Sequence, residues 1–126
     1  TAVTPSLTDY AVVGVSGVTS ANLATINSAL ATTAVGSAQV DTLGELQTVV
    51  DAFNRILAEA NGAAADANAG VNPSAADYSA IGATTAAGFA NGSAQQSLLN
   101  TVIGAQTTSG VDTVAKIEAL ARLTHA

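Results

Sequence analysis

Residues 42–62 read TLGELQTVVDAFNRILAEANG, and this stretch decides the fold. Thr42 followed three residues later by Glu45 forms a capping box, a pattern that begins many helices. Apolar residues then recur along one face within an arc of about 140°. They are Leu43, Leu46, Val49, Val50, Phe53, Ile56, Leu57 and Ala60. Gly62 closes the run. The pattern predicts a long amphipathic helix, with Phe53 as its largest core candidate.

The opposite face of this predicted helix is polar. Asp51, Arg55 and Glu59 follow one another at four-residue spacing, which predicts ion pairs along an exposed face. Gly44 is a poor helix former just inside the start of the helix. We therefore expect another helix to approach closely at Gly44.

The chain contains an internal duplication. The segment PSLTDYAVVG at residues 5–14 matches PSAADYSAIG at residues 73–82 without a gap. Two more matches follow in the same order, INSAL at 26–30 with LNTVI at 99–103 and VDTL at 40–43 with VDTV at 111–114. Ordered matches of this kind indicate two copies of one structural unit.

Each copy predicts three helices, and the first is short. A serine begins it and an aspartate follows three residues later, where a carboxylate favours the free N–H groups of the first turn. A glycine ends it, as glycine often does after a helix. The serine–aspartate pairs are Ser6 with Asp9 and Ser74 with Asp77, and the closing glycines are Gly14 and Gly82.

The later helices of the two copies also correspond. The second helix is predicted from about residue 20 to residue 32 in copy one, with Leu23, Ile26 and Leu30 on one face. In copy two it begins at Ser93, where Gln96 completes a capping box. The third helix of copy two keeps an apolar stripe at Val114, Ile117, Leu120 and Ala121. Ala126 aligns with Arg55, so we expect the chain to stop partway through a repeat.

These patterns predict an all-α fold of two tandem three-helix-bundle repeats. The first repeat is residues 1–62, the linker is residues 63–73, and the second repeat is residues 74–126 with a shortened third helix. A bundle of about 55 residues is marginally stable alone. Only 3% of the residues are aromatic. We therefore expect the two copies to stack or to share an interface.

Composition excludes several classes of protein. The net charge is −6 and only three residues are Lys or Arg, too few to neutralise a run of phosphates or to hold an anionic membrane surface. No apolar stretch approaches the roughly 18 residues that span a bilayer. Without cysteine the chain has no disulfide, thiolate nucleophile or zinc–thiolate site. We therefore expect neither nucleic acid as a partner nor membrane insertion.

No catalytic, cofactor-binding or metal-ligating residue is predicted. His125 is the only histidine and lies one residue from the end, so we expect a solvated residue. The carboxylates have structural explanations, because most lie near helix N-termini or beside Arg55. Tyr10 and Tyr78 occupy equivalent positions, which predicts a ring packed on the third helix with its hydroxyl at the surface.

A weaker candidate is a calcium site at the junction. Residues 66–77 place oxygen-bearing side chains at several positions of an EF-hand loop. Val71 stands where that loop requires glycine, so we predict no EF-hand. A loose calcium contact remains an alternative to a plain polar linker.

The motifs of copy one resemble a known kind of repeat. They are a short helix with Asp9-Tyr10, a Gly14-Val15 turn, the helix NLATINSAL at residues 22–30, and Val-Asp-Thr before the long helix. This order resembles the helical repeats of very large bacterial surface adhesins, including biofilm-associated and type I-secreted proteins. It is also distantly similar to the three-helix GA module, which binds serum albumin in Gram-positive surface proteins.

The resemblance covers residues 5–62 well and residues 73–126 less well, because residues 83–92 depart from the compact loop of copy one. It implies an extracellular, cell-surface, non-enzymatic role in spacing or presenting adhesive regions. The partners it implies are neighbouring repeats or copies of the chain itself. It transfers no albumin site, because the contact residues of that module have no counterparts here.

The sequence is also compatible with two other functions. One is a self-assembling filament or surface-layer subunit, in which the stacking of repeats continues between chains. The other is a small helical module that binds a host protein or a polysaccharide through an exposed apolar patch. An enzyme is the last alternative.

Overall fold

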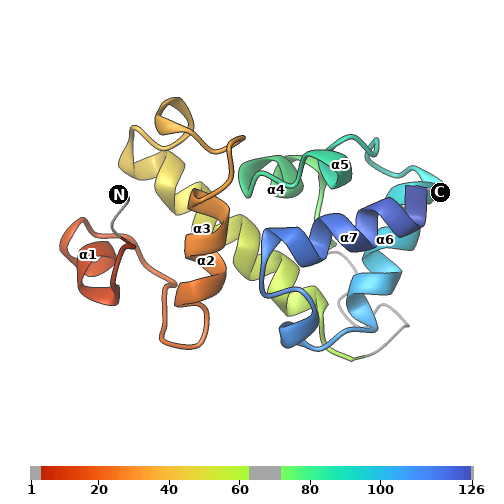
Figure 1. The fold of residues 1–126 in the computed structure, drawn as a ribbon, viewed down its shortest axis with the longest axis horizontal. Helices are drawn as coiled ribbons and strands as arrows, with labels where there is room; N and C mark the ends of the chain where they lie inside the picture. The colour runs from red at the N-terminus through yellow and green to blue at the C-terminus, as the bar shows by residue number, and fades with distance from the viewer. Residues whose placement is uncertain (1–3, 63–71, 126) are drawn as a thin grey trace.

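The computed structural model describes residues 4–62 and 72–125, and every regular element of these residues is a helix (Figure 1). This confirms the all-α class. Copy one contains α1 (Leu7–Val12), α2 (Leu23–Leu30), the 3₁₀ turn η1 (Ser37–Gln39) and α3 (Leu43–Glu59). Copy two contains α4 (Ala75–Ala80), α5 (Thr84–Ala87), α6 (Ala94–Gly104), the 3₁₀ turn η2 (Thr108–Gly110) and α7 (Val114–His125).

The predicted helix starts of α1, α3 and α4 are confirmed by their caps. In α1 the Ser6 hydroxyl accepts from the Asp9 N–H at 3.3 Å, and the Asp9 carboxylate accepts from the Ser6 N–H at 2.8 Å. The same reciprocal pair opens α4. Thr42 and Glu45 form the third capping box, with both bonds at 3.1 Å. Each box satisfies backbone donors that the first turn of a helix leaves free.

Three details of the helices differ from expectation. α2 begins at Leu23, because Asn22 turns its side chain back to accept from the Thr19 N–H and holds the preceding residues in a turn. At the start of α6, the Gln96 side chain accepts from Gly92 instead of completing a capping box. α5 was not predicted. Its first turn is capped from α7, where the Glu118 carboxylate accepts from two backbone N–H groups of α5.

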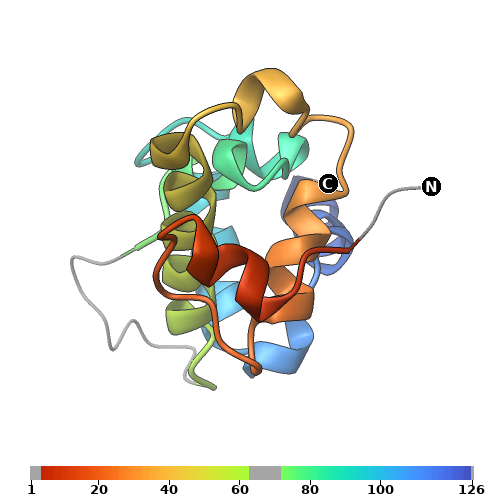
Figure 2. The same ribbon diagram turned by 90° about the vertical axis from the view of Figure 1, so that its left-hand side faces the viewer.

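The long helix α3 belongs to copy one but contacts both copies. It packs on α2 of its own copy and on α4 and α6 of the other, while α2 also contacts α7. The buried apolar residues of both copies form one continuous cluster. The expectation that the copies share an interface is therefore confirmed. The view along the long axis shows α1 in front, at one end of the molecule (Figure 2).

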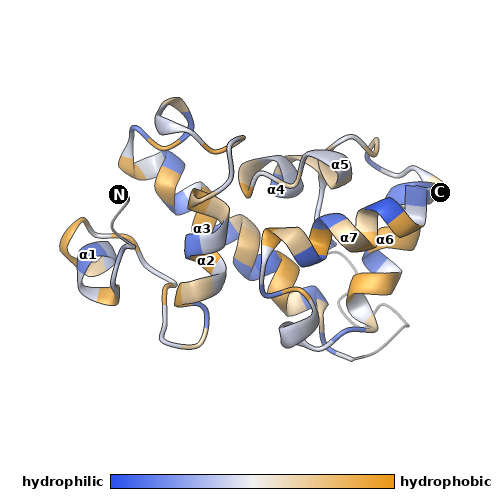
Figure 3. Ribbon diagram, viewed as in Figure 1, coloured by the Kyte–Doolittle hydropathy of each residue, from blue (hydrophilic) through white to orange (hydrophobic). Residues whose placement is uncertain are grey.

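Contact on two sides widens the buried face of α3. The predicted stripe is buried from Val49 onward except at Leu57, which is partly buried, and Leu43 at its start is 51% exposed. Glu59, expected on the exposed polar face, is only 4% exposed, and its charge acts on Tyr78 of copy two. The expectation for Gly44 is wrong, since a methyl group added there would meet nothing within 4 Å. Apolar residues lie along α3, α6 and α7 and also around α1 (Figure 3).

The predicted linker, residues 63–73, lies outside the described residues except for Asn72 and Pro73. No described helix is both long enough and apolar enough to cross a membrane.

Candidate functional site

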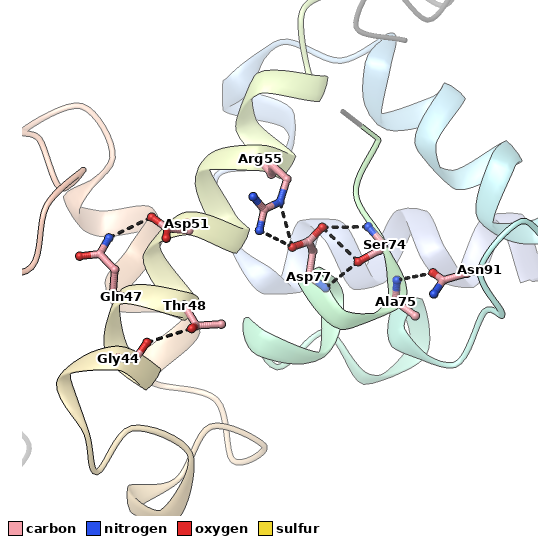
Figure 4. A network of polar contacts seen from close by, with 9 residues as sticks. All are labelled: Gly44, Gln47, Thr48, Asp51, Arg55, Ser74, Ala75, Asp77 and Asn91. Carbon is pink, nitrogen blue, oxygen red and sulfur yellow. Dashed lines mark hydrogen bonds and ion pairs between the residues drawn. The ribbon is translucent and has the colours of Figure 1, made fainter. Parts of the chain in front are cut away.

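The candidate site is the contact between α3 and α4, where the two copies meet. Arg55 of α3 points at Asp77 in the first turn of α4 (Figure 4). Its Nε and Nη2 atoms both donate to Asp77 Oδ1, at 3.0 and 2.9 Å. The other carboxylate oxygen, Oδ2, accepts from the backbone N–H and the hydroxyl of Ser74. One carboxylate therefore caps its own helix and binds the neighbouring copy.

This ion pair orients the two copies more than it stabilises them. The Arg55 side chain is 45% exposed and that of Asp77 is 10% exposed. Hydrogen bonds from Arg55 to Asp77 and the charge of that carboxylate raise the pKa of Arg55, so its charge is secure. An ion pair with one half-exposed partner contributes about 0–1 kcal/mol to the free energy of unfolding. The partner of Arg55 is thus Asp77 of the other copy, whereas Asp51 accepts from Gln47 at 2.9 Å.

A buried polar triad occurs once in each copy. Tyr10 donates from Oη to Asn27 Oδ1 at 2.6 Å, and Asn27 Nδ2 donates to the Pro5 carbonyl at 2.9 Å. The corresponding atoms of Tyr78, Asn100 and Pro73 form the same contacts, at 2.5 and 3.1 Å. The triads join α1 to α2 in copy one and α4 to α6 in copy two. The prediction of surface hydroxyls is wrong, because both phenols donate to an asparagine inside the fold.

Two further bonds join the copies. The Gly62 N–H donates to the Gln106 carbonyl at 2.9 Å, after the ends of α3 and α6. The Val114 N–H at the start of α7 donates to the Ser28 hydroxyl of α2 at 3.3 Å. Hydrogen bonds therefore join copy one to copy two after the end of α6 and at the start of α7, as well as at α4.

Replacing the two tyrosines by phenylalanine should have unequal effects. Tyr78→Phe leaves Asn100 Oδ1 without its donor in a buried site, and we expect a loss of about 1–3 kcal/mol. Tyr10→Phe is the matched control, and there water can reach the half-buried Asn27, so we expect about 0.5–1.5 kcal/mol. Urea unfolding of both variants measures the difference. An equal loss in both would contradict the burial of the second triad.

Tyr78 should also make the protein sensitive to alkali. Burial raises the pKa of Tyr78 far above its ordinary value, and the charges of Glu59 and Asp77 raise it further. A group whose pKa is raised on folding stabilises the fold below its unfolded pKa, about 10 for tyrosine, and that stability is lost as the pH rises above it. In a Tyr10→Phe chain, phenolate absorbance should therefore appear only with loss of helical circular dichroism. Phenolate formation near pH 10 with the helices intact would contradict the prediction.

The other sequence candidates remain apart from one another. His125 is exposed, as expected, and its ring lies 5.6 Å from that of Phe89. In the described part of the chain no three His, Asp or Glu side chains gather as a metal would require. The first half of the EF-hand-like segment, residues 66–71, lies outside the described residues, and its last member, Asp77, is bonded to Arg55 and Ser74.

Between described residues, shallow hollows lie at α3–α4, at α2–η2 and at α2–α7. Each is lined by a single ionisable residue, respectively Glu45, Asp112 and Glu118. An acid–base pair of carboxylates needs two such groups facing one cleft. None of the three hollows offers that pair.

The residues that sequence reasoning missed are the asparagines of the triads and the partner of Arg55. Asn27 and Asn100 carried a usable signal, because both are polar residues beside buried aliphatic residues at matched positions. The pairing of Arg55 with Asp77 carried none, because it depends on how the two copies sit. Compared with known proteins, the chain matches no protein-family model, no curated protein and no solved structure.

Proposed function

We propose that the chain is a pair of tandem three-helix repeats, the second with the additional short helix α5, from a secreted bacterial cell-surface protein. In this role it is non-enzymatic and spaces or presents adhesive regions. The single observation that carries the proposal is the α3–α4 interface, at which two copies of one sequence motif share a core. Repeats that contact only their neighbours and bury a common core form extended, stiff arrays. A stiff array is what a spacer between adhesive regions requires.

Several features support this role over catalysis. The triads and capping boxes recur in both copies, so the buried polar groups serve the fold of each repeat. The resemblance of residues 5–62 to the helical repeats of large bacterial adhesins supplies the expected location, outside the cell. The acidic charge of −6 suits a solvated surface domain.

The test is the intact mass of the natural protein, isolated from the cells that make it, with peptides mapped onto this sequence. We expect a mass many times 12.2 kDa, related repeats on both sides, and recovery in the surface or secreted fraction. A mass near 12.2 kDa would overturn the proposal. It would favour a self-assembling subunit or a small binding module instead.

A further inference from the structure

The first helices of the two copies have the same local structure. α1 and α4 begin with the same capping box, Ser6 with Asp9 and Ser74 with Asp77. Both end with a glycine in the left-handed region, and both carry a buried tyrosine that donates to an asparagine. The two helices therefore differ only in how far the rest of the molecule covers them.

α4 is covered and α1 is not. Asp77 is buried under Arg55 of α3, whereas its counterpart Asp9 is exposed. Ile81, just after α4, is fully buried, whereas its counterpart Val13 is 50% exposed. Val12 and Val13 are adjacent and both exposed, and contiguous exposed apolar residues mark an interaction surface more strongly than scattered ones.

The closing glycines repeat this contrast. A methyl group on Gly82 would overlap Thr32 at the end of α2, because the turn after α4 rests on copy one. The same group on Gly14 would meet nothing within 4 Å. The end of α1 is thus open where the end of α4 is in tight contact.

The other end of the molecule also exposes an apolar residue whose counterpart is buried. Ala52 of α3 is 1% exposed, in the helix that packs on copy two, whereas its counterpart in α7, Leu123, is 73% exposed. α1 and the last turn of α7 lie at opposite ends of the long axis (Figure 1). The outer face of α7 is therefore exposed at Leu123, where the equivalent face of α3 is buried at Ala52.

We propose that the face formed by Asp9, Val12, Val13 and Gly14 is the docking surface for the α3-type helix, and for the segment after the α2-type helix, of a preceding repeat in the same polypeptide. That helix would place the equivalent of Arg55 on Asp9, as Arg55 lies on Asp77 within the chain. The inference rests on the proposed function, since it needs a repeat before copy one, and it adds how consecutive repeats are joined. The Arg55–Asp77 pair supplies the charge complementarity, and the close contact of Gly82 with Thr32 and Val35 supplies the fit at the end of the helix.

The test is a three-repeat chain in which residues 1–72 precede residue 5, so that Asn72 is followed by Pro5 as it is naturally followed by Pro73. Hydrogen exchange of the α1 amides in the original copy one is compared with the unextended chain. We expect about tenfold slower exchange or more in the extended chain, because docking removes local opening of a terminal helix. Unchanged exchange would overturn the inference.

Substitutions separate docking from attachment alone. Val13→Asp in the original copy should leave the unextended chain folded, yet restore fast α1 exchange in the extended chain. Arg55→Gln in the added copy should speed α1 exchange by about threefold, as a partly exposed ion pair allows. The same change at the original Arg55 is the matched control and should leave α1 unaffected.

Other occupants of the face would give a different result. If α1 exchange in the unextended chain slows with protein concentration, a second chain fills the face and the inference is overturned. The proposed function fails on a separate measurement, the mass of the natural protein. A large mass with no protection of α1 would remove the docking surface and leave the proposed function standing.

Discussion

Phe53→Ala should lower the free energy of unfolding by about 3–5 kcal/mol, the range for truncating a buried aromatic side chain. Phe53 is fully buried in α3, and its neighbours belong to one core that joins both copies. A loss of this size is a large part of the about 5–15 kcal/mol that stabilises an ordinary domain. Because the core is shared, we expect both copies to unfold together in one transition at lower urea concentration.

Leu43→Ala is the matched control on the same helix. Leu43 belongs to the same apolar stripe in the sequence but is 51% exposed, so we expect a change of about 0.5 kcal/mol or less. Circular dichroism follows the total helix content, and hydrogen exchange of assigned amides follows each copy separately. A Phe53→Ala chain in which copy two keeps its protection while copy one unfolds would show that the two copies are independent, contrary to the shared core.

Local structure could be predicted from the sequence because short-range chemistry determines it. Ser6 with Asp9 and Thr42 with Glu45 are close along the chain, so their caps follow from spacing alone. The duplication predicted that the two copies would match, and the repeated triads agree with it. α5 was missed because its cap comes from Glu118, more than thirty residues away in the sequence.

The residues of the interface between the copies could not be predicted. Hydrophobic periodicity indicates one buried face of a helix, whereas α3 is buried on two sides. Ala52 is too small to extend an apolar stripe, and Glu59 is polar, yet both are buried in α3, which packs on helices of both copies. Arg55 had acidic neighbours at helical spacing in the sequence, but Asp77 offered it a carboxylate already fixed by a capping box. Gly44 was predicted to mark a close helix contact, whereas the tight contacts between elements are made by Gly82 against Thr32 and by Gly17 against Asn54 of α3.

Gly82→Ala should therefore be more damaging than the equivalent change in copy one. Gly82 and Gly14 have nearly the same left-handed backbone, with φ of +83° and +87°. An L-residue in that conformation costs about 1–2 kcal/mol at either site. At Gly14 the added methyl group enters open space, so no further loss is expected. At Gly82 it overlaps Thr32 Oγ1 and comes within 3.1 Å of Val35 Cγ2.

Thr32 cannot easily move away from that methyl group. Its hydroxyl donates to the Ala29 carbonyl at 2.8 Å and accepts from the Val35 N–H at 3.3 Å, which holds the end of α2 in place. Overpacking of this kind adds about 1–3 kcal/mol to the loss at Gly82. Urea unfolding of the two alanine variants measures the difference, and Thr32→Ala should recover part of it by removing the oxygen. If both glycines tolerate alanine equally, the turn after α4 does not rest on the end of α2, and the placement of copy two against copy one is wrong.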